Sequence, residues 1–176
     1  MTINIEPIIS KSCPQLVIGV ISCRVKNSDS DHNLWDEISN AADAFRQKYT
    51  IDQINKIPAI QATRQAYKTL GKDPNRYRPS AEALCRRIVK NMDLYRINTL
   101  VDIINLVSIE SGYSIGGFDA DKIQGNLTLT VGSKDDEFEA IGRGLLNIEG
   151  LPVYKDSQGG IGTPTSDNER TKIGMN

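Results

Sequence analysis

The stretch NTLVDIINLVSIESG, residues 98–112, divides the sequence into a helical half and a strand-rich half. Asn98 is a residue type that often caps the start of a helix, and Gly112 is the natural residue just after the end of one. Between them, apolar residues recur at helical spacing, which predicts a helix from about Thr99 to Ser111. We expect its buried stripe to consist of Leu100, Ile103, Ile104 and Val107.

Three further helices are expected before this stretch. Each is predicted by apolar residues that recur at helical spacing, so that one face of the helix is buried. The first follows several N-cap candidates in residues 27–31 and ends near Tyr49. The second runs from about Pro58 to Leu70, and the third begins at Ser80 and ends near Asn91.

Residues 15–23 are predicted to form a strand, because Val17, Ile18, Val20 and Ile21 are β-branched. The stretch is apolar throughout. That pattern is typical of a strand that is covered on both faces, and we expect this strand to join the main sheet.

After Gly112, apolar residues occur in short pieces separated by Gly, Asp and Asn. Residues 126–131 alternate polar and apolar, which predicts a half-buried strand. Shorter strands are expected at 152–154 and 171–173, and a flexible glycine-rich turn at 159–162. The fold class is therefore α+β, with helices packed on a mainly antiparallel sheet. We expect a single domain over residues 1–176, in which residues 1–60 form an N-terminal strand-and-helix extension.

Composition excludes several kinds of chemistry. The 176 residues include three cysteines without a Cys-x-x-Cys pair, and the single histidine, His32, lies in a polar stretch that opens a helix. Neither pattern predicts a metal site, and no glycine-rich piece matches a nucleotide-binding loop, so no cofactor is expected. The absence of a long apolar run and of a basic N-terminal leader predicts a cytoplasmic protein without a membrane partner.

Charge is distributed unevenly along the chain. Residues 64–96 hold nine basic and three acidic residues, a net charge of +6, whereas the rest holds 12 basic and 19 acidic residues, a net charge of −7. The basic stretch is either a solvated helical surface or a face that binds an anionic partner. The candidate phosphate-binding residues are Arg76, Arg78, Arg86, Arg87 and Lys90.

Polar residues at positions 98, 102, 105 and 108 form a line along the predicted helix. They offer amide, carboxylate and hydroxyl groups to a ligand pocket, or else Asn98 caps the helix and Asp102 pairs with an arginine. Asp119 and Asp121 are two residues apart. They either hold a cation or form a turn that bonds its own backbone, which is the simpler interpretation.

Three segments together resemble a known family. They are Arg78 to Arg87 (RPSAEALCRR), Ile97 to Asn105 (INTLVDIIN), and Gly112 through Phe118-Asp119-Ala120-Asp121-Lys122-Ile123. In order and spacing they are similar to the B3/B4 domain of the phenylalanyl-tRNA synthetase beta subunit. The resemblance covers about residues 67–173, and the ending Gly162 to Asp167 followed by Arg170 to Ile173 is similar to freestanding relatives of that domain.

The resemblance implies contact with tRNA, at its acceptor end, and hydrolysis of mischarged aminoacyl-tRNA in trans, without ligase activity and without DNA as a partner. Bacterial synthetases often have His and Thr where this chain has Gly116 and Ile104, so no catalytic residue is assigned. Two alternatives stay open: a non-catalytic protein that binds a free amino acid or similar small molecule, and an interaction protein whose pocket is filled by its own side chains. The residues expected to border the pocket are Asn98, Asp102, Asn105, Gly116, Gly117, Asp119 and Asp167.

Overall fold

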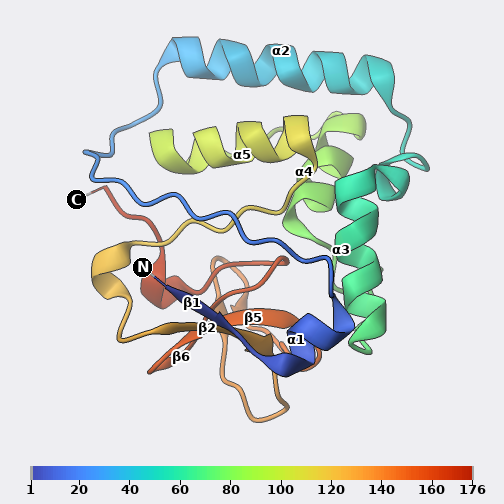
Figure 1. The fold of residues 1–176 in the computed structure, drawn as a ribbon. Coiled ribbons are helices and arrows are strands. Elements are labelled where there is room, and N and C mark those ends of the chain that lie inside the picture. Colours follow the sequence, from blue (N-terminus) through green and yellow to red (C-terminus); the bar gives the residue numbers. More distant parts are fainter. Residues whose placement is uncertain (1, 176) are drawn as a thin grey trace.

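The computed structural model of the chain describes residues 2–175. It is an α+β structure in which helices pack on a mostly antiparallel sheet, as the sequence predicts (Figure 1). The helices are α1 (Pro7–Ser12), α2 (His32–Lys48), α3 (Pro58–Thr69), α4 (Ser80–Val89) and α5 (Thr99–Ser111), with short 3-10 turns η1 (Ile54–Lys56), η2 (Ala120–Lys122) and η3 (Glu169–Thr171). The strands are β1 (Ile3–Ile5), β2 (Leu127–Val131), β3 (Glu139–Ala140), β4 (Gly144–Leu145), β5 (Pro152–Asp156) and β6 (Gly159–Gly162).

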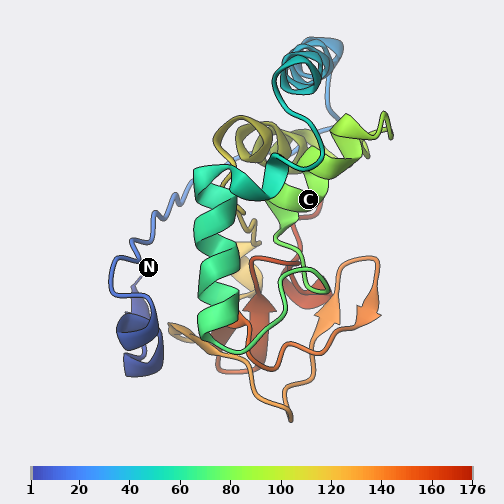
Figure 2. The ribbon, with the colours of Figure 1, turned by 90° about the vertical axis from the view of Figure 1, so that its right-hand side faces the viewer.

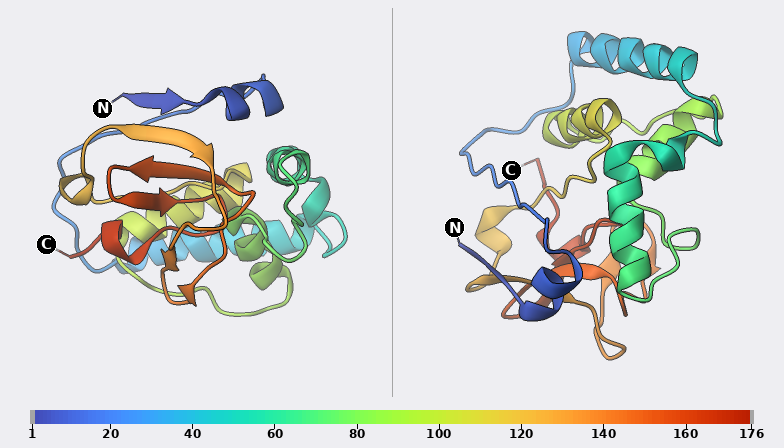
Figure 3. Two further views of the ribbon diagram at one scale, coloured as in Figure 1. Left: turned by 90° about the horizontal axis from the view of Figure 1, so that it is seen from below. Right: turned by 45° about the vertical axis from the view of Figure 1, so that its right-hand side comes forward.

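The main sheet has the order β1-β2-β5-β6, and the strands are seen from below in the left view of Figure 3. β1 pairs with β2 in parallel, whereas β2 with β5 and β5 with β6 are antiparallel. β3 and β4 form a separate two-stranded sheet. The parallel edge strand comes from the first residues of the chain, and the other three come from its second half.

Two apolar clusters hold the layers together. The helical cluster joins residues of α2, α3, α4 and α5, including Phe45, Ile60 and Ile88. The sheet cluster is formed around Tyr67 of α3 and Phe138, both at most 1% exposed. α3 therefore links the two layers, and Figure 2 shows it running from the helical layer to the sheet.

The helix boundaries follow their capping residues. Asp31 accepts a hydrogen bond from the Leu34 N–H at the start of α2, and Asn98 accepts one from the Val101 N–H at the start of α5. Gly112 ends α5 with φ 77°, in the left-handed region where glycine is favoured. Within residues 2–175, no helix combines the length and the apolar character that a membrane span requires.

The strand predicted over residues 15–23 is absent from the structure, and the sheet receives β1 instead. Residues 15–23 form an extended segment without regular secondary structure, which crosses in front of the space between α5 and the sheet (Figure 1). Val17 is 88% exposed and Ile21 is 94% exposed. The apolar pattern predicted a strand covered on both faces, and that prediction is wrong: the backbone is extended but most of the side chains are exposed.

The predicted buried stripe of α5 is wrong in part, because Leu100 and Ile104 are half-buried but the other two residues are exposed. Ile103 and Val107 are 42% and 43% exposed, whereas Asp102, Ser108 and Ile109 are buried. The physical reason is that Asp102 accepts a hydrogen bond from the Trp35 Nε1–H of α2. This bond compensates the cost of burying a polar face.

Residues 159–162 form strand β6 and not the predicted flexible turn, which lies at Ser157 and Gln158 instead. A Cβ atom on Gly160 would lie 2.8 Å from Phe138 Cδ2, so the glycine lets the strand pack closely against this ring. Residues 171–173 form no regular strand, because Thr171 ends η3. Lys172 forms an isolated bridge with Phe118.

Candidate functional site

The carboxyl group of Asp167 is the centre of the candidate site. Asp167 follows β6 through a turn in which the Thr163 Oγ1 accepts hydrogen bonds from the N–H groups of Thr165 and Ser166. Its own backbone C=O accepts a bond from the Ile141 N–H at 3.0 Å. These bonds fix the backbone on both sides of Asp167, so its side chain has a defined position.

Three glycines surround this carboxyl group. The Gly117 N–H donates to Asp167 Oδ2 at 3.0 Å. Cβ atoms built on Gly116 and Gly162 would lie 3.1 Å and 2.8 Å from Asp167 Oδ1. Any larger residue at Gly162 would press on the carboxylate, so glycine is required for this close approach.

Burial raises the pKa of Asp167 to about 7, and the hydrogen bond from Gly117 opposes this rise only in part. Desolvation disfavours the charged form of a carboxyl group, which is why the shift is upward. A carboxyl group with a pKa near 7 gains or loses a proton at neutral pH. It therefore has the property that a general acid or base requires.

Apolar side chains occupy the space in front of these glycines. A Cβ atom on Gly117 would lie 2.7 Å from Ile104 Cδ1 and 2.8 Å from Ile173 Cδ1. The Phe118 ring packs against Gly162, and a Cβ atom on this glycine would lie 2.5 Å from Phe118 Cζ. Ile104, Phe118 and Ile173 therefore pack closely against the glycines that surround the Asp167 carboxyl group.

Asn98 and Asp102 are engaged elsewhere. Asn98 is 4% exposed and caps α5, while Asp102 is 1% exposed and accepts bonds from Ser30 Oγ at 2.5 Å, Trp35 Nε1 at 3.1 Å and the Ile97 N–H at 3.2 Å. Asp102 and Ile104 lie on opposite faces of α5, since two residues span about 200° of a helix. The structure therefore does not bring Asp102 together with Gly116 and Gly117, which lie on the Ile104 side.

Asn105 and Asp119 complete the set of predicted pocket residues. Asn105 lies half-buried on α5, one residue beyond Ile104. Asp119 accepts a bond from the Asp121 N–H at 3.2 Å and forms an ion pair with Lys122 at 3.2 Å, so it supports the turn η2. Of the seven predicted residues, the structure brings together Gly116, Gly117 and Asp167.

The basic stretch is partly internal. Arg64 is buried and donates to Glu82 Oε2 at 2.8 Å, and Lys72 donates to two backbone oxygens, those of Asn147 and Glu149. Arg86 donates to the second Glu82 oxygen at 2.8 Å. The remaining candidates for phosphate binding keep exposed or half-buried side chains: Arg76, Arg78, Arg87 and Lys90.

Two pairs of arginine and aromatic residues involve the end of α4 and the segment after it, and our sequence reasoning did not find them. The Arg87 guanidinium lies 4.4 Å from the centre of the Tyr95 ring, and the Arg96 guanidinium lies 4.4 Å from that of Trp35. The available signal was an aromatic residue next to an arginine, Tyr95 and Arg96, in a segment whose apolar residues have no regular spacing. Trp35, however, lies about 60 residues away in the chain, and only the fold shows this contact.

Comparison with known proteins identifies a family and a relative that the chain resembles. The family model of the B3/4 domain matches residues 62–176, more than half of the chain. A stretch of 52 residues is 40% identical to the phenylalanine–tRNA ligase beta subunit of Bartonella henselae. That stretch is 30% of this chain and 6% of the bacterial subunit, so the chain spans only a small part of this relative.

Proposed function

Because the chain belongs to the B3/4 domain family, we propose that it is an RNA-binding protein whose partner is tRNA. The matching relative is a subunit of a tRNA ligase, which supports tRNA as the RNA class. The matched stretch is too small a part of that subunit to carry ligation. We therefore propose binding, together with inspection of the aminoacyl end, in the cytoplasm.

We propose that Arg76, Arg78, Arg87 and Lys90 supply the phosphate contacts. Basic side chains on phosphates give affinity that does not depend on the base sequence and that weakens as salt is added. Arg86 contributes less in this proposal, because Glu82 already holds its guanidinium.

The finer proposal is hydrolysis of a mischarged aminoacyl-tRNA, and one observation carries it: the desolvated Asp167 carboxyl group among three glycines. Asp167 would accept a proton from a water molecule whose oxygen attacks the ester carbonyl carbon. The bond between that carbon and the ribose oxygen then breaks, and the proton passes from Asp167 to the ribose oxygen. A pKa near 7 lets the same group accept and return the proton at neutral pH.

A second candidate function is non-catalytic binding of a free amino acid or similar small molecule. The observation that favours it is the packing of Ile104, Phe118 and Ile173 against the glycines. A site with so little space near Asp167 accepts a small ligand more readily than an RNA terminus. In that case the basic surface would have no role in the activity.

Two measurements on the full chain test these proposals. The first is a tRNA-binding titration at several salt concentrations, in which we expect affinity to fall as salt rises. The second is a deacylation assay with a panel of mischarged tRNAs, in which we expect Asp167→Asn to remove activity. Asp121→Asn is the matched control, because Asp121 is an exposed carboxylate on η2.

The outcomes separate the candidates. Binding without hydrolysis of any mischarged tRNA leaves an RNA-binding module and rejects the role of Asp167. Failure of both measurements, with a rise in melting temperature on adding an amino acid, establishes the second candidate instead.

A further inference from the structure

A groove lies between α2 and the segment that follows α4, far from Asp167. Its cavity volume is about 530 Å³, and its lining includes Trp35, Ile38, Arg46, Ile88, Met92 and Arg96. Figure 1 shows α2 at the top of the molecule and β6, which precedes Asp167, at the bottom. A cavity of this size is within the range of sites for small organic ligands.

The wall formed by residues 90–96 is held rigidly. Asn91 has φ 53°, and it ends α4 in the left-handed conformation. The Met92 N–H donates to the Arg87 C=O, and the Asn91 N–H donates to the Ile88 C=O, which is the bond pattern of a Schellman motif. Arg87 also donates twice to the Asp93 C=O, at 2.6 Å and 3.1 Å. The groove is therefore preorganised, although this wall has no regular secondary structure.

Two arginine guanidinium groups are paired with aromatic rings, one pair across the groove and one beside it. The Arg96 guanidinium covers Trp35, which keeps only 9% of its surface exposed. The Arg87 guanidinium lies on Tyr95, which stands between two lining residues in the chain and is 67% exposed. Burial does not explain why an aromatic ring is held in this position with most of its surface in water.

The charges around the groove favour an anionic ligand at its edge. Asp43 is neutralised by an ion pair with Arg46, which leaves Asp93 as the other acidic residue of the lining. Within residues 2–175, neither Arg87 nor Arg96 forms an ion pair, and Lys90 is exposed beside them. Within the lining, Arg46 and Arg96 balance Asp43 and Asp93, so the excess positive charge comes from Arg87 and Lys90 beside the groove.

We infer that this groove, together with Tyr95 beside it, binds unpaired nucleotides of an RNA strand, with bases stacked on Tyr95 and on the Arg96 guanidinium. Unpaired bases are commonly recognised by stacking on aromatic rings and on arginine planes, with basic side chains on the phosphates. The inference rests on the proposed RNA-binding function, but it concerns a second surface. It also assigns a role to α2, which lies outside the matched residues 62–176.

The chain carries its own probe for this site, because Trp35 is its single tryptophan. The experiment is a titration of the full chain with a short single-stranded oligoadenylate, followed by Trp35 fluorescence and by anisotropy of labelled RNA. We expect the fluorescence to change on binding, and duplex RNA of the same length to bind more weakly. Tyr95→Ala should weaken binding about tenfold, while Tyr95→Phe should retain it.

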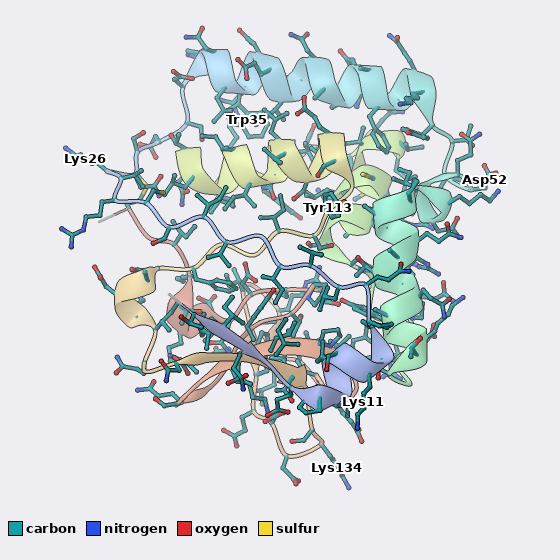
Figure 4. All side chains as sticks on the ribbon, in the orientation of Figure 1. Lys11, Lys26, Trp35, Asp52, Tyr113 and Lys134 are labelled. Carbon is teal, nitrogen blue, oxygen red and sulfur yellow. The ribbon has the colours of Figure 1, made fainter. Side chains whose placement is uncertain are left out.

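Matched variants keep the test decisive. Tyr113→Ala is the control, because Tyr113 is 64% exposed and lies well apart from Trp35 in Figure 4. Arg96→Lys keeps the positive charge but loses the planar guanidinium on which a base would stack, so it should also weaken binding. This variant keeps the test valid even if Arg96→Ala does not fold. Unchanged affinity in Tyr95→Ala and Arg96→Lys, or a Trp35 response to an acidic peptide but not to RNA, would overturn the inference.

The two proposals fail in different ways. If Asp167→Asn loses hydrolysis but binds oligoadenylate as before, the Asp167 site and the groove are two separate sites, and both proposals are supported. Salt-dependent tRNA binding without any oligoadenylate binding rejects the groove and leaves the proposed function. Absence of binding to both RNAs rejects the groove together with the RNA-binding function.

Discussion

Two parts of the molecule place their side chains in opposite ways. At the contact of α3 with α4, the charged residues Arg64 and Glu82 are buried, with side chains 10% and 0% exposed. In residues 14–26, the apolar side chains of Val17 and Ile21 are almost fully exposed. The difference follows from the available partners, since Glu82 binds two arginines, whereas residues 17–26 form no hydrogen bond with the rest of residues 2–175.

The comparison shows why residue type alone predicts burial poorly. A buried ion pair is tolerated when hydrogen bonds satisfy its members, and Arg64 also donates to the Pro74 C=O and to Asn75. An apolar strand is buried only when the chain supplies a surface to cover it.

The largest effect is expected at Glu82. Glu82→Ala leaves two arginines without their carboxylate, one of them buried, and should lower the free energy of unfolding by about 3–5 kcal/mol. Urea unfolding followed by circular dichroism measures it, with the exposed Glu137→Ala as a control that changes stability by no more than about 0.5 kcal/mol. If Glu82→Ala loses no more stability than the control, the buried Glu82 does not stabilise the fold through its two arginines.

The next effect concerns Asp167 and pH. Its pKa is about 7 in the folded chain and about 3.9 in an unfolded one, so the folded state binds more protons between these values. Stability should therefore fall as pH rises from about 4 to 7, by up to about 4 kcal/mol from this group. Asp167→Asn should remove that slope, and it should raise stability at pH 8 while it abolishes hydrolysis. Unfolding curves at several pH values test this, and a slope that persists in the variant contradicts it.

A smaller effect of opposite sign is expected at Asp156. Burial raises the pKa of its carboxyl group, but hydrogen bonds from Arg170, Gln124 and Gln158 outweigh burial and hold the pKa below its usual range. This stabilisation is present above about pH 4 and is lost as pH falls through the lowered pKa. Asp156→Asn should cost about 1–3 kcal/mol at pH 7 and flatten the acid limb of the stability curve. The exposed Asp135→Asn is the control, and equal curves for the two variants would refute the role of Asp156.

The smallest effect is expected in the exposed segment. A double variant with Val17→Ser and Ile21→Ser should change the free energy of unfolding by no more than about 0.5 kcal/mol, because both side chains are already in water. Ile60→Ala in the helical cluster should cost about 2–5 kcal/mol in the same assay. If the double variant loses as much as Ile60→Ala, then a surface that the structure does not supply covers residues 15–23.

The helices were predicted better from the sequence than the contacts that decide which of their faces are buried. The boundaries of α5 were predictable, because Asn98 and Gly112 act locally through caps and backbone conformation. Its buried face was not, because the burial of Asp102 depends on Trp35 and Ser30, more than 60 residues away. Similarly, the glycines of β6 signal a turn when considered alone, and only the Phe138 ring shows that they allow close packing.

The candidate site was predictable in part. The family resemblance indicated Gly116, Gly117 and Asp167, and the structure places these three together. Their spacing of 50 residues contains no signal that a carboxyl group would be desolvated there. The groove at Trp35 and Arg96 had no signal beyond the composition of residues 90–96, since α2 completes it from a distant part of the chain.

The claim on which the site depends most is the desolvation of Asp167 at the Gly117 amide. The direct measurement is a pH titration by NMR of the Asp167 side-chain carboxyl carbon, followed together with the Gly117 amide proton. The structure predicts one shared midpoint near pH 7, because both nuclei report the same protonation. A midpoint near pH 4, or a Gly117 amide that does not respond to the titration, would contradict the site.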